Sequence, residues 1–117
     1  MIVTAIIPAR NEQHTIARAM QRVDRAIRRW GHRPDIIVIN DGSTDNTGGV
    51  AERAAHGPDL DAVVLHNERP RNLGGAFRQG LTLARGAVVF LYPGDDEGSD
   101  AQLDALLNEM PGPRPSP

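Results

Sequence analysis

Three acidic side chains, Asp95, Asp96 and Glu97, stand side by side directly after a glycine in the last quarter of the sequence. Adjacent carboxylates repel one another unless water or a cation screens them. Their oxygen atoms are the ligands that Mg²⁺ and Mn²⁺ prefer, and such an ion can bridge the protein to a diphosphate. We therefore expect Asp95 and Asp96 to bind a divalent metal ion. A solvated acidic loop is the alternative interpretation.

Groups suited to a nucleotide occur earlier in the sequence. Asp41 can accept hydrogen bonds from the N–H or O–H groups of a base or ribose. Arg69 or Arg71 can pair with phosphate oxygens. A metal-bound nucleotide diphosphate would use all of these groups together. The alternative for Asp41-Gly42 is a plain turn, since this residue pair is common in turns.

The apolar pattern indicates which elements position these groups. Short β-branched runs predict four strands, and apolar residues at helical spacing predict four helices. Ser43 or Thr44 is expected to cap the second helix. In chain order we expect strand Ile2–Ile7, helix Glu12–Trp30, strand Asp35–Ile39, helix Thr44–Ala55, strand Asp61–His66, helix Leu73–Arg85, strand Gly86–Tyr92 and helix Ser99–Met110.

Strands that alternate with helices imply right-handed crossovers and a mostly parallel sheet covered on both faces. The predicted fold class is therefore α/β: a Rossmann-like three-layer α/β/α sandwich with about four strands. Ligands bind such sheets beyond the carboxyl ends of the strands. The polar segments above all follow predicted strands, so we expect them to form one site.

Composition limits the class of protein. The chain has 117 residues, 39% of them hydrophobic, and a net charge of −2, which is typical of one globular domain and not of a nucleic-acid-binding protein. With no cysteine, disulfides and thiolate metal sites are excluded. No apolar run is long enough to form a transmembrane segment, so we expect a cytoplasmic protein. The predicted domain covers residues 1–110, and the Pro-rich segment 111–117 is expected to be a flexible tail.

Charge is distributed unevenly along the chain. All 13 cationic side chains are arginine. Residues 1–34 contain seven of them against two acidic residues, and residues 92–117 contain one against six. The two ends either have separate electrostatic roles or neutralise each other. Arg18, Arg22, Arg25 and Arg29 follow helical spacing, and we expect them to form a solvated helix face.

Four segments together resemble the N-terminal half of a family 2 glycosyltransferase with the GT-A fold. They occur in the family's order: Val3–Glu12 (VTAIIPARNE), Ile36–Thr47 (IIVINDGSTDNT), Asn72–Gly75 (NLGG) and Ala84–Asp96 (ARGAVVFLYPGDD). The second segment is the most specific of the four.

The resemblance implies a UDP- or GDP-sugar donor bound with Mg²⁺ or Mn²⁺. It also implies transfer to an acceptor hydroxyl with inversion at the anomeric carbon. By position, the nucleotide-binding residues would be Pro8, Arg10, Glu12, Asp41, Arg71, Asn72 and Gly74, and the metal ligands would be Asp95 and Asp96.

The sequence departs from the family pattern at several positions. Arg10 stands where the family often has tyrosine, and Asn40 replaces the first aspartate of Asp-Asp-Gly-Ser. The Asp-x-Asp frame falls on Tyr92 and Gly94, which leaves only the shifted pair Asp95-Asp96.

The sequence covers only the donor-binding half of such an enzyme, and no residue matches the family's catalytic base. We therefore expect a truncated or minimal member. The alternative is a non-catalytic nucleotide-sugar-binding module that acts with a partner chain. The missing half would leave a sheet edge exposed, which favours self-association or a partner. A nucleotidyltransferase or a dinucleotide dehydrogenase is disfavoured, because residues 8–12 contain no glycine.

Overall fold

The computed structural model describes residues 1–111, so the predicted tail lies outside the described residues apart from Pro111. Strands and helices alternate in the predicted order. Their bounds are β1 (Ile2–Ala9), α1 (Ile16–Arg29), β2 (Arg33–Asp41), α2 (Thr47–Ala55), β3 (Ala62–Asn67), α3 (Asn72–Leu83), β4 (Val88–Leu91) and α4 (Asp100–Asn108).

The four strands form one parallel sheet in the order β3-β2-β1-β4. The chain therefore moves outward from β1 to β3 and then crosses back to place β4 on the other side of β1. The predicted mostly parallel sheet is confirmed. Strands β3 and β4 are the two edges of this sheet within residues 1–111.

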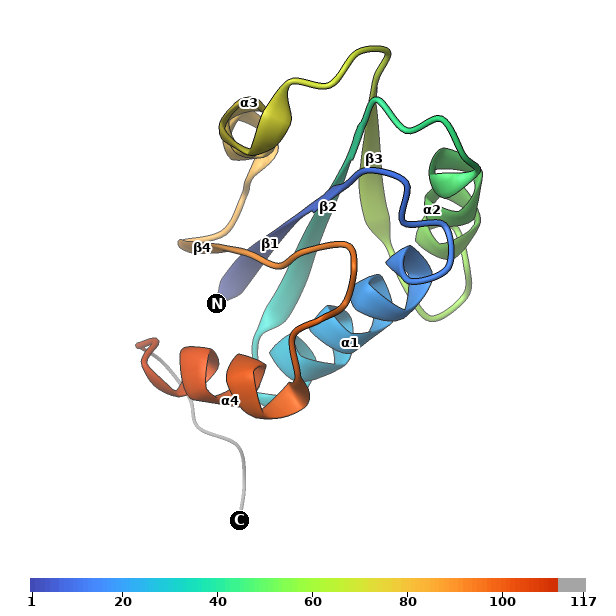
Figure 1. Ribbon diagram of the computed structural model, residues 1–117. Helices are drawn as coiled ribbons and strands as arrows, with labels where there is room; N and C mark the ends of the chain where they lie inside the picture. The colour runs from blue at the N-terminus through green and yellow to red at the C-terminus, as the bar shows by residue number, and fades with distance from the viewer. Residues whose placement is uncertain (112–117) are drawn as a thin grey trace.

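Helices cover both faces of the sheet, as the predicted three-layer sandwich requires (Figure 1). α1, α2 and α4 pack on one face, over a core that includes Val3 and Ile7 of β1 and Met20 of α1. α3 packs alone on the other face, over a smaller core that contains Ile6 and Ile37. Each fully buried aliphatic side chain contributes about 1.5–3 kcal/mol to folding.

α2 begins at Thr47 rather than at Thr44, because the residues before it bond elsewhere. Ser43 Oγ accepts the N–H of Asn11 at 3.0 Å, and the N–H of Thr44 donates to Asn11 Oδ1 at 2.8 Å. The Asp45 carboxylate accepts the Thr47 N–H at 2.9 Å. The prediction that Ser43 or Thr44 caps this helix is therefore wrong, and both residues instead tie the loop after β2 to the loop after β1.

Candidate functional site

The carboxyl ends of the four parallel strands lie along one edge of the sheet (Figure 1). This edge runs across the strands and differs from the two edges that β3 and β4 form. A polar loop follows each strand at this edge: residues 10–15 after β1, 42–46 after β2, 68–71 after β3 and 92–99 after β4. The loops position the side chains that the sequence singles out.

A hollow of about 290 Å³ opens between the ends of β1 and β2 and the start of α3. Four of the predicted nucleotide-binding residues, Pro8, Arg10, Asp41 and Asn72, line it. Residues from three segments that are distant in sequence, at the ends of β1 and β2 and at the start of α3, therefore meet in one place. Ala9 and Leu73 complete the wall, and Leu73 is 60% exposed.

The Asp41 carboxylate is buried and held in one orientation. Its Oδ1 accepts the backbone N–H of Arg71 at 2.7 Å and the amide of Asn67 at 3.0 Å. Asn67 is itself held by Gln79 of α3 through two reciprocal amide hydrogen bonds of 2.7 and 2.8 Å. Within residues 1–111 no group donates to Asp41 Oδ2. That oxygen is an acceptor available to a ligand in the hollow.

Gly42 allows the chain to turn directly after Asp41. It has a φ of +72°, and a Cβ there would lie 2.6 Å from Pro70. The turn that the sequence offered as an alternative is therefore present, and it packs under the loop that carries Arg71. The turn and a binding role for Asp41 are compatible.

The other two predicted nucleotide-binding residues of this region lie beside the hollow rather than in its wall. The exposed side chain of Arg71 borders a neighbouring depression with Arg69. Gly74 is exposed in the first turn of α3, and no atom lies within 4 Å of the place its Cβ would occupy. Both are next in sequence to residues of the wall, since Arg71 precedes Asn72 and Gly74 follows Leu73.

Glu12 lies at the start of α1, among other carboxylates. The helix begins at Ile16 rather than at Glu12, whose carbonyl oxygen accepts the Ile16 N–H at 2.9 Å. Burial raises the pKa of the Glu12 carboxyl, and repulsion from Asp95 raises it further. Asp45 and Glu97 add smaller effects in the same direction, while a hydrogen bond from Thr15 opposes them. The negative charges that act on Glu12 therefore come from two other loops, the one after β2 and the one after β4.

The turn after β4 is fastened to the end of β1. The Gly94 N–H donates to the carbonyl of Pro8 at 2.9 Å, and the Thr15 hydroxyl donates to the carbonyl of Gly94 at 2.8 Å. A Cβ on Gly94 would lie 2.7 Å from the Cβ of Ala9, so only glycine fits this approach. The attachment places Asp95 beside the start of α1.

Asp96 does not join this group of carboxylates. Its side chain is 1% exposed and packs against α1, where it accepts hydrogen bonds from Arg18 Nε at 2.8 Å and Arg22 Nε at 2.9 Å. The Tyr92 hydroxyl donates a third bond of 2.7 Å. Burial alone would raise the pKa of Asp96, but the bonds from Tyr92, Arg18 and Arg22 outweigh it and lower that pKa. This geometry speaks against the expected metal role of Asp96.

The arginine face of α1 is not simply solvated, contrary to the sequence prediction. Besides the pairs with Asp96, Arg22 pairs with Asp100 at 2.9 Å and Arg29 with Asp104 at 2.6 Å. Trp30 donates to the same Asp104 at 2.7 Å. The basic first segment and the acidic last segment therefore neutralise each other across α1 and α4.

No three His, Asp or Glu side chains within residues 1–111 are arranged to hold a metal ion by themselves. Mg²⁺ and Mn²⁺ commonly bind through one or two carboxylates, with the remaining ligands from water and substrate phosphates. Asp95, next to the partly buried Glu12, fits that mode of binding. A metal site here would need the diphosphate to complete it.

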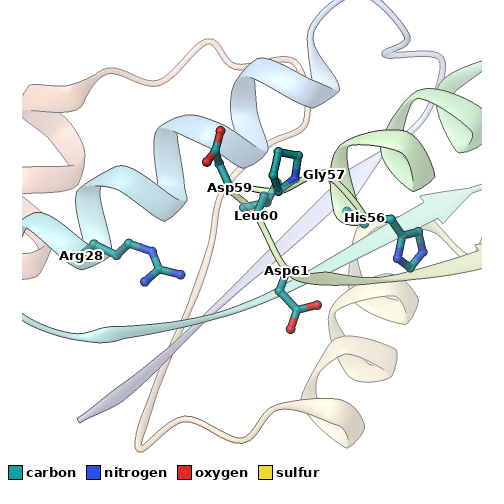
Figure 2. Close-up of a pocket in the computed structure, with 8 residues that line it drawn as sticks. Arg28, His56, Gly57, Asp59, Leu60 and Asp61 are labelled. Atoms are coloured by element: carbon teal, nitrogen blue, oxygen red, sulfur yellow. The ribbon is translucent and has the colours of Figure 1, made fainter.

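A second hollow, of about 540 Å³, lies at the opposite end of the sheet, between α1 and the loop before β3 (Figure 2). Its wall combines Arg28 with Asp59, Asp61 and His56. The carboxylates of Asp59 and Asp61 point in opposite directions rather than toward a common point (Figure 2). No residue that the sequence predicts for binding lies in this hollow.

Sequence reasoning missed the residues that hold the site in shape. Asn67, Gln79 and Thr15 act through hydrogen bonds to groups far away in the chain, and no local pattern marks such residues. The pairing of α1 arginines with Asp96 did leave a signal, because the excess of positive charge at one end of the sequence matches the excess of negative charge at the other.

Comparison with protein families settles the relationship that the motifs suggest. The profile of the family described as "Glycosyl transferase family 2" matches residues 4–116. The chain belongs to this family. Among curated relatives of the family-2 chain, the undecaprenyl-phosphate 4-deoxy-4-formamido-L-arabinose transferase of Pseudomonas fluorescens is 30% identical over 111 residues. That alignment covers 92% of this chain and 31% of the transferase.

Solved structures confirm the GT-A fold of this family-2 chain. A mannosyltransferase from Pyrobaculum calidifontis, in complex with GDP-Man and Mn²⁺, matches with a TM-score of 0.70 and 24% identity over 90% of this chain and 31% of its own. The glucosyl-3-phosphoglycerate synthase of Mycobacterium tuberculosis, with Mn²⁺, UDP and phosphoglyceric acid, matches with a TM-score of 0.62 and 23% identity, covering 79% and 32% of the two chains. At such identities the likeness shows the fold.

The family-2 chain spans about a third of the length of the curated relatives that it matches. It corresponds to their N-terminal part, as the sequence motifs predict. Among its described residues, none of the helices combines the length and the apolar character that crossing a membrane would require.

Proposed function

We propose that this chain binds the nucleotide-diphospho-sugar donor of a glycosyl transfer reaction, together with a divalent metal ion. The observation that carries the proposal is that the hollow around Asp41 and the carboxylates around Glu12 lie along the same edge of the sheet. One can hold a nucleoside and the other a metal-bound diphosphate. GDP-Man or UDP with Mn²⁺ in the two structural neighbours supports this assignment.

The nucleoside would occupy the hollow lined by Pro8, Arg10, Asp41 and Asn72. Asp41 Oδ2 would accept an N–H of the base or an O–H of the ribose. Arg71 would pair with phosphate oxygens, because its side chain is exposed beside the hollow. Gly74, which has open space above it, would let the diphosphate approach the first turn of α3, where backbone N–H groups point outward.

Asp95 would bind the metal ion, and Glu12 would add negative charge next to it. A bound Mg²⁺ or Mn²⁺ supplies charge neutralisation for the departing diphosphate. Burial raises the pKa of Glu12, and repulsion from Asp95 adds to this effect; a cation between the two carboxylates would relieve that repulsion. Pro8 and Thr15 hold Asp95 in place through Gly94.

The acceptor and the catalytic base are expected to come from outside this segment. In the complete reaction the sugar would pass to an acceptor hydroxyl with inversion at the anomeric carbon. Within residues 1–111 strand β4 pairs with no further strand at its outer edge, which favours a second candidate: a donor-binding module that acts with a partner chain. Both candidates require the same donor site and differ in turnover.

Isothermal titration calorimetry tests the shared requirement. We expect UDP-glucose or GDP-mannose to bind with 1:1 stoichiometry in MnCl₂ and much more weakly with EDTA, while ATP serves as the comparison nucleotide. Equal binding of all three, or none, would overturn the proposal. Release of UDP or GDP in the same samples above the background rate would indicate an enzyme rather than a module.

A further inference from the structure

The Asp96 carboxylate is almost completely buried near the donor site, with a side chain that is 1% exposed. Three side chains close around it: Arg18 and Arg22 of α1, and Tyr92, the first residue after β4. Asp96 also has a φ of +56°, a conformation that is unusual for a residue with a side chain. A residue held in such a conformation persists only where its surroundings fix it.

The position of Asp96 in the turn determines where its neighbour lies. Gly94, two residues before it, is fastened to Pro8 and Thr15. Asp96 is fastened to α1, and its N–H donates to the carbonyl of Pro93 at 3.2 Å. Asp95 therefore stands between two fixed points of the turn.

We propose that Asp96 is a positioning residue of the donor site: paired with Arg18 and Arg22, it fixes the turn that presents Asp95 to the metal-bound diphosphate, and it is not itself a metal ligand. The inference rests on the proposed function. The two adjacent aspartates then have different roles: Asp95 faces the donor, and Asp96 anchors the loop to α1.

The proposal distinguishes two roles that a substitution of Asp96 alone would confuse. If Asp96 were a ligand, removing Arg22 would free its carboxylate and leave Mn²⁺ affinity unchanged or increased. If Asp96 positions Asp95, removing Arg22 loosens the turn and weakens Mn²⁺ binding in the same way as a change at Asp96. Arg22 is therefore the decisive position.

The experiment measures Mn²⁺ affinity in the presence of UDP, from the electron paramagnetic resonance signal of free Mn²⁺. The variants are Arg22→Gln, Asp96→Asn, both together, and Asp95→Asn. Partners that orient metal ligands typically change affinity by about tenfold or more, so we expect about tenfold weaker binding from each of the first two. The double variant should be no weaker than the worse single one, because the two residues act as a unit. Asp95→Asn should abolish saturable binding.

Arg29→Gln is the matched control, because Arg29 of the same helix α1 pairs with Asp104 of α4, away from the turn. It should lower the melting temperature without changing Mn²⁺ affinity. Amide hydrogen exchange without metal provides a second measurement: Arg22→Gln should speed exchange at Asp96 and Glu97, and Arg29→Gln should not.

Each outcome decides the matter. Asp96 would be a metal ligand if the Arg22→Gln variant binds Mn²⁺ as tightly as the parent while the Asp96→Asn variant does not bind it. Parental affinity in both variants, with binding lost in Asp95→Asn, would refute the positioning role and leave the proposed function intact. A parent chain that binds neither Mn²⁺ nor UDP would overturn both.

Discussion

Replacing Asp41 by asparagine tests the nucleoside end of the proposed site. In the folded protein Asp41 Oδ1 accepts two hydrogen bonds, from the backbone of Arg71 and the side chain of Asn67, while Oδ2 is left for the ligand. The substitution keeps the size of the side chain and one oxygen. It replaces the ligand-facing acceptor with an NH₂ group, which cannot accept an N–H or O–H of a nucleoside.

The expected magnitude follows from the bonds that change. A hydrogen bond to a charged acceptor contributes about 1 kcal/mol more than one to a neutral acceptor, so two weakened bonds cost about 2 kcal/mol of unfolding free energy. Losing the acceptor in the hollow should cost about 2 kcal/mol of binding free energy, or about 30-fold in Kd. Urea denaturation and calorimetry with UDP-glucose or GDP-mannose measure the two effects separately.

Asp35→Asn is the matched control, because Asp35 lies on the same face of β2 at the opposite end of the strand. Its buried carboxylate accepts the Thr4 hydroxyl at 2.7 Å and the Arg85 N–H at 2.8 Å. It should lose at least as much stability as Asp41→Asn and keep the parental Kd. An Asp41→Asn protein that is folded and binds the donor like the parent would refute the assignment of the hollow.

Three further predictions concern the support of the site, acid stability and association. Gln79→Ala removes both bonds to Asn67 and should cost about 1–2 kcal/mol of unfolding free energy, with a several-fold rise in nucleotide Kd. The pKa of Asp35 is lowered in the folded state: burial opposes the shift, but bonds from Arg85 and Thr4 outweigh it. Its stabilisation is therefore complete above the unfolded pKa of about 3.9 and is lost as the pH falls toward the folded pKa; Asp35→Asn should flatten this acid limb in pH-dependent denaturation. Within residues 1–111 the outer edge of β4 pairs with no further strand, so light scattering should detect concentration-dependent self-association, and a monomer at every concentration would contradict this expectation.

The fold was predictable because its signals are local. Apolar runs such as Ile36–Ile39 mark buried parallel strands, and the helical spacing of Ile16, Met20, Val23 and Ile27 marks the buried face of α1. Once the strands are known to be parallel, the residues that follow them must share an edge. The meeting of Pro8, Arg10 and Asp41 around one hollow follows from this rule.

The role of Asp96 was not predictable in the same way, since it depends on partners more than 70 residues away. Adjacent aspartates look equivalent in a sequence, but the positive φ at Asp96 turns its carboxylate toward α1. The hydrogen bonds that orient Asp41 were not predictable either. They depend on Asn67 of β3 and Gln79 of α3, which meet only because the strand and the helix pack together. Local patterns identify residue types, and packing decides which of them face a ligand.

The central claim is that a metal-bound sugar nucleotide occupies the edge where the strands end. Paramagnetic broadening of backbone amides by Mn²⁺, measured by NMR on the ¹⁵N-labelled chain with UDP-glucose or GDP-mannose, locates the ion directly. We predict the strongest broadening at Glu12 and Asp95, and unchanged signals in the loop of residues 57–61 at the opposite end of the sheet. Broadening centred on that loop, or none at saturating donor, would contradict the claim.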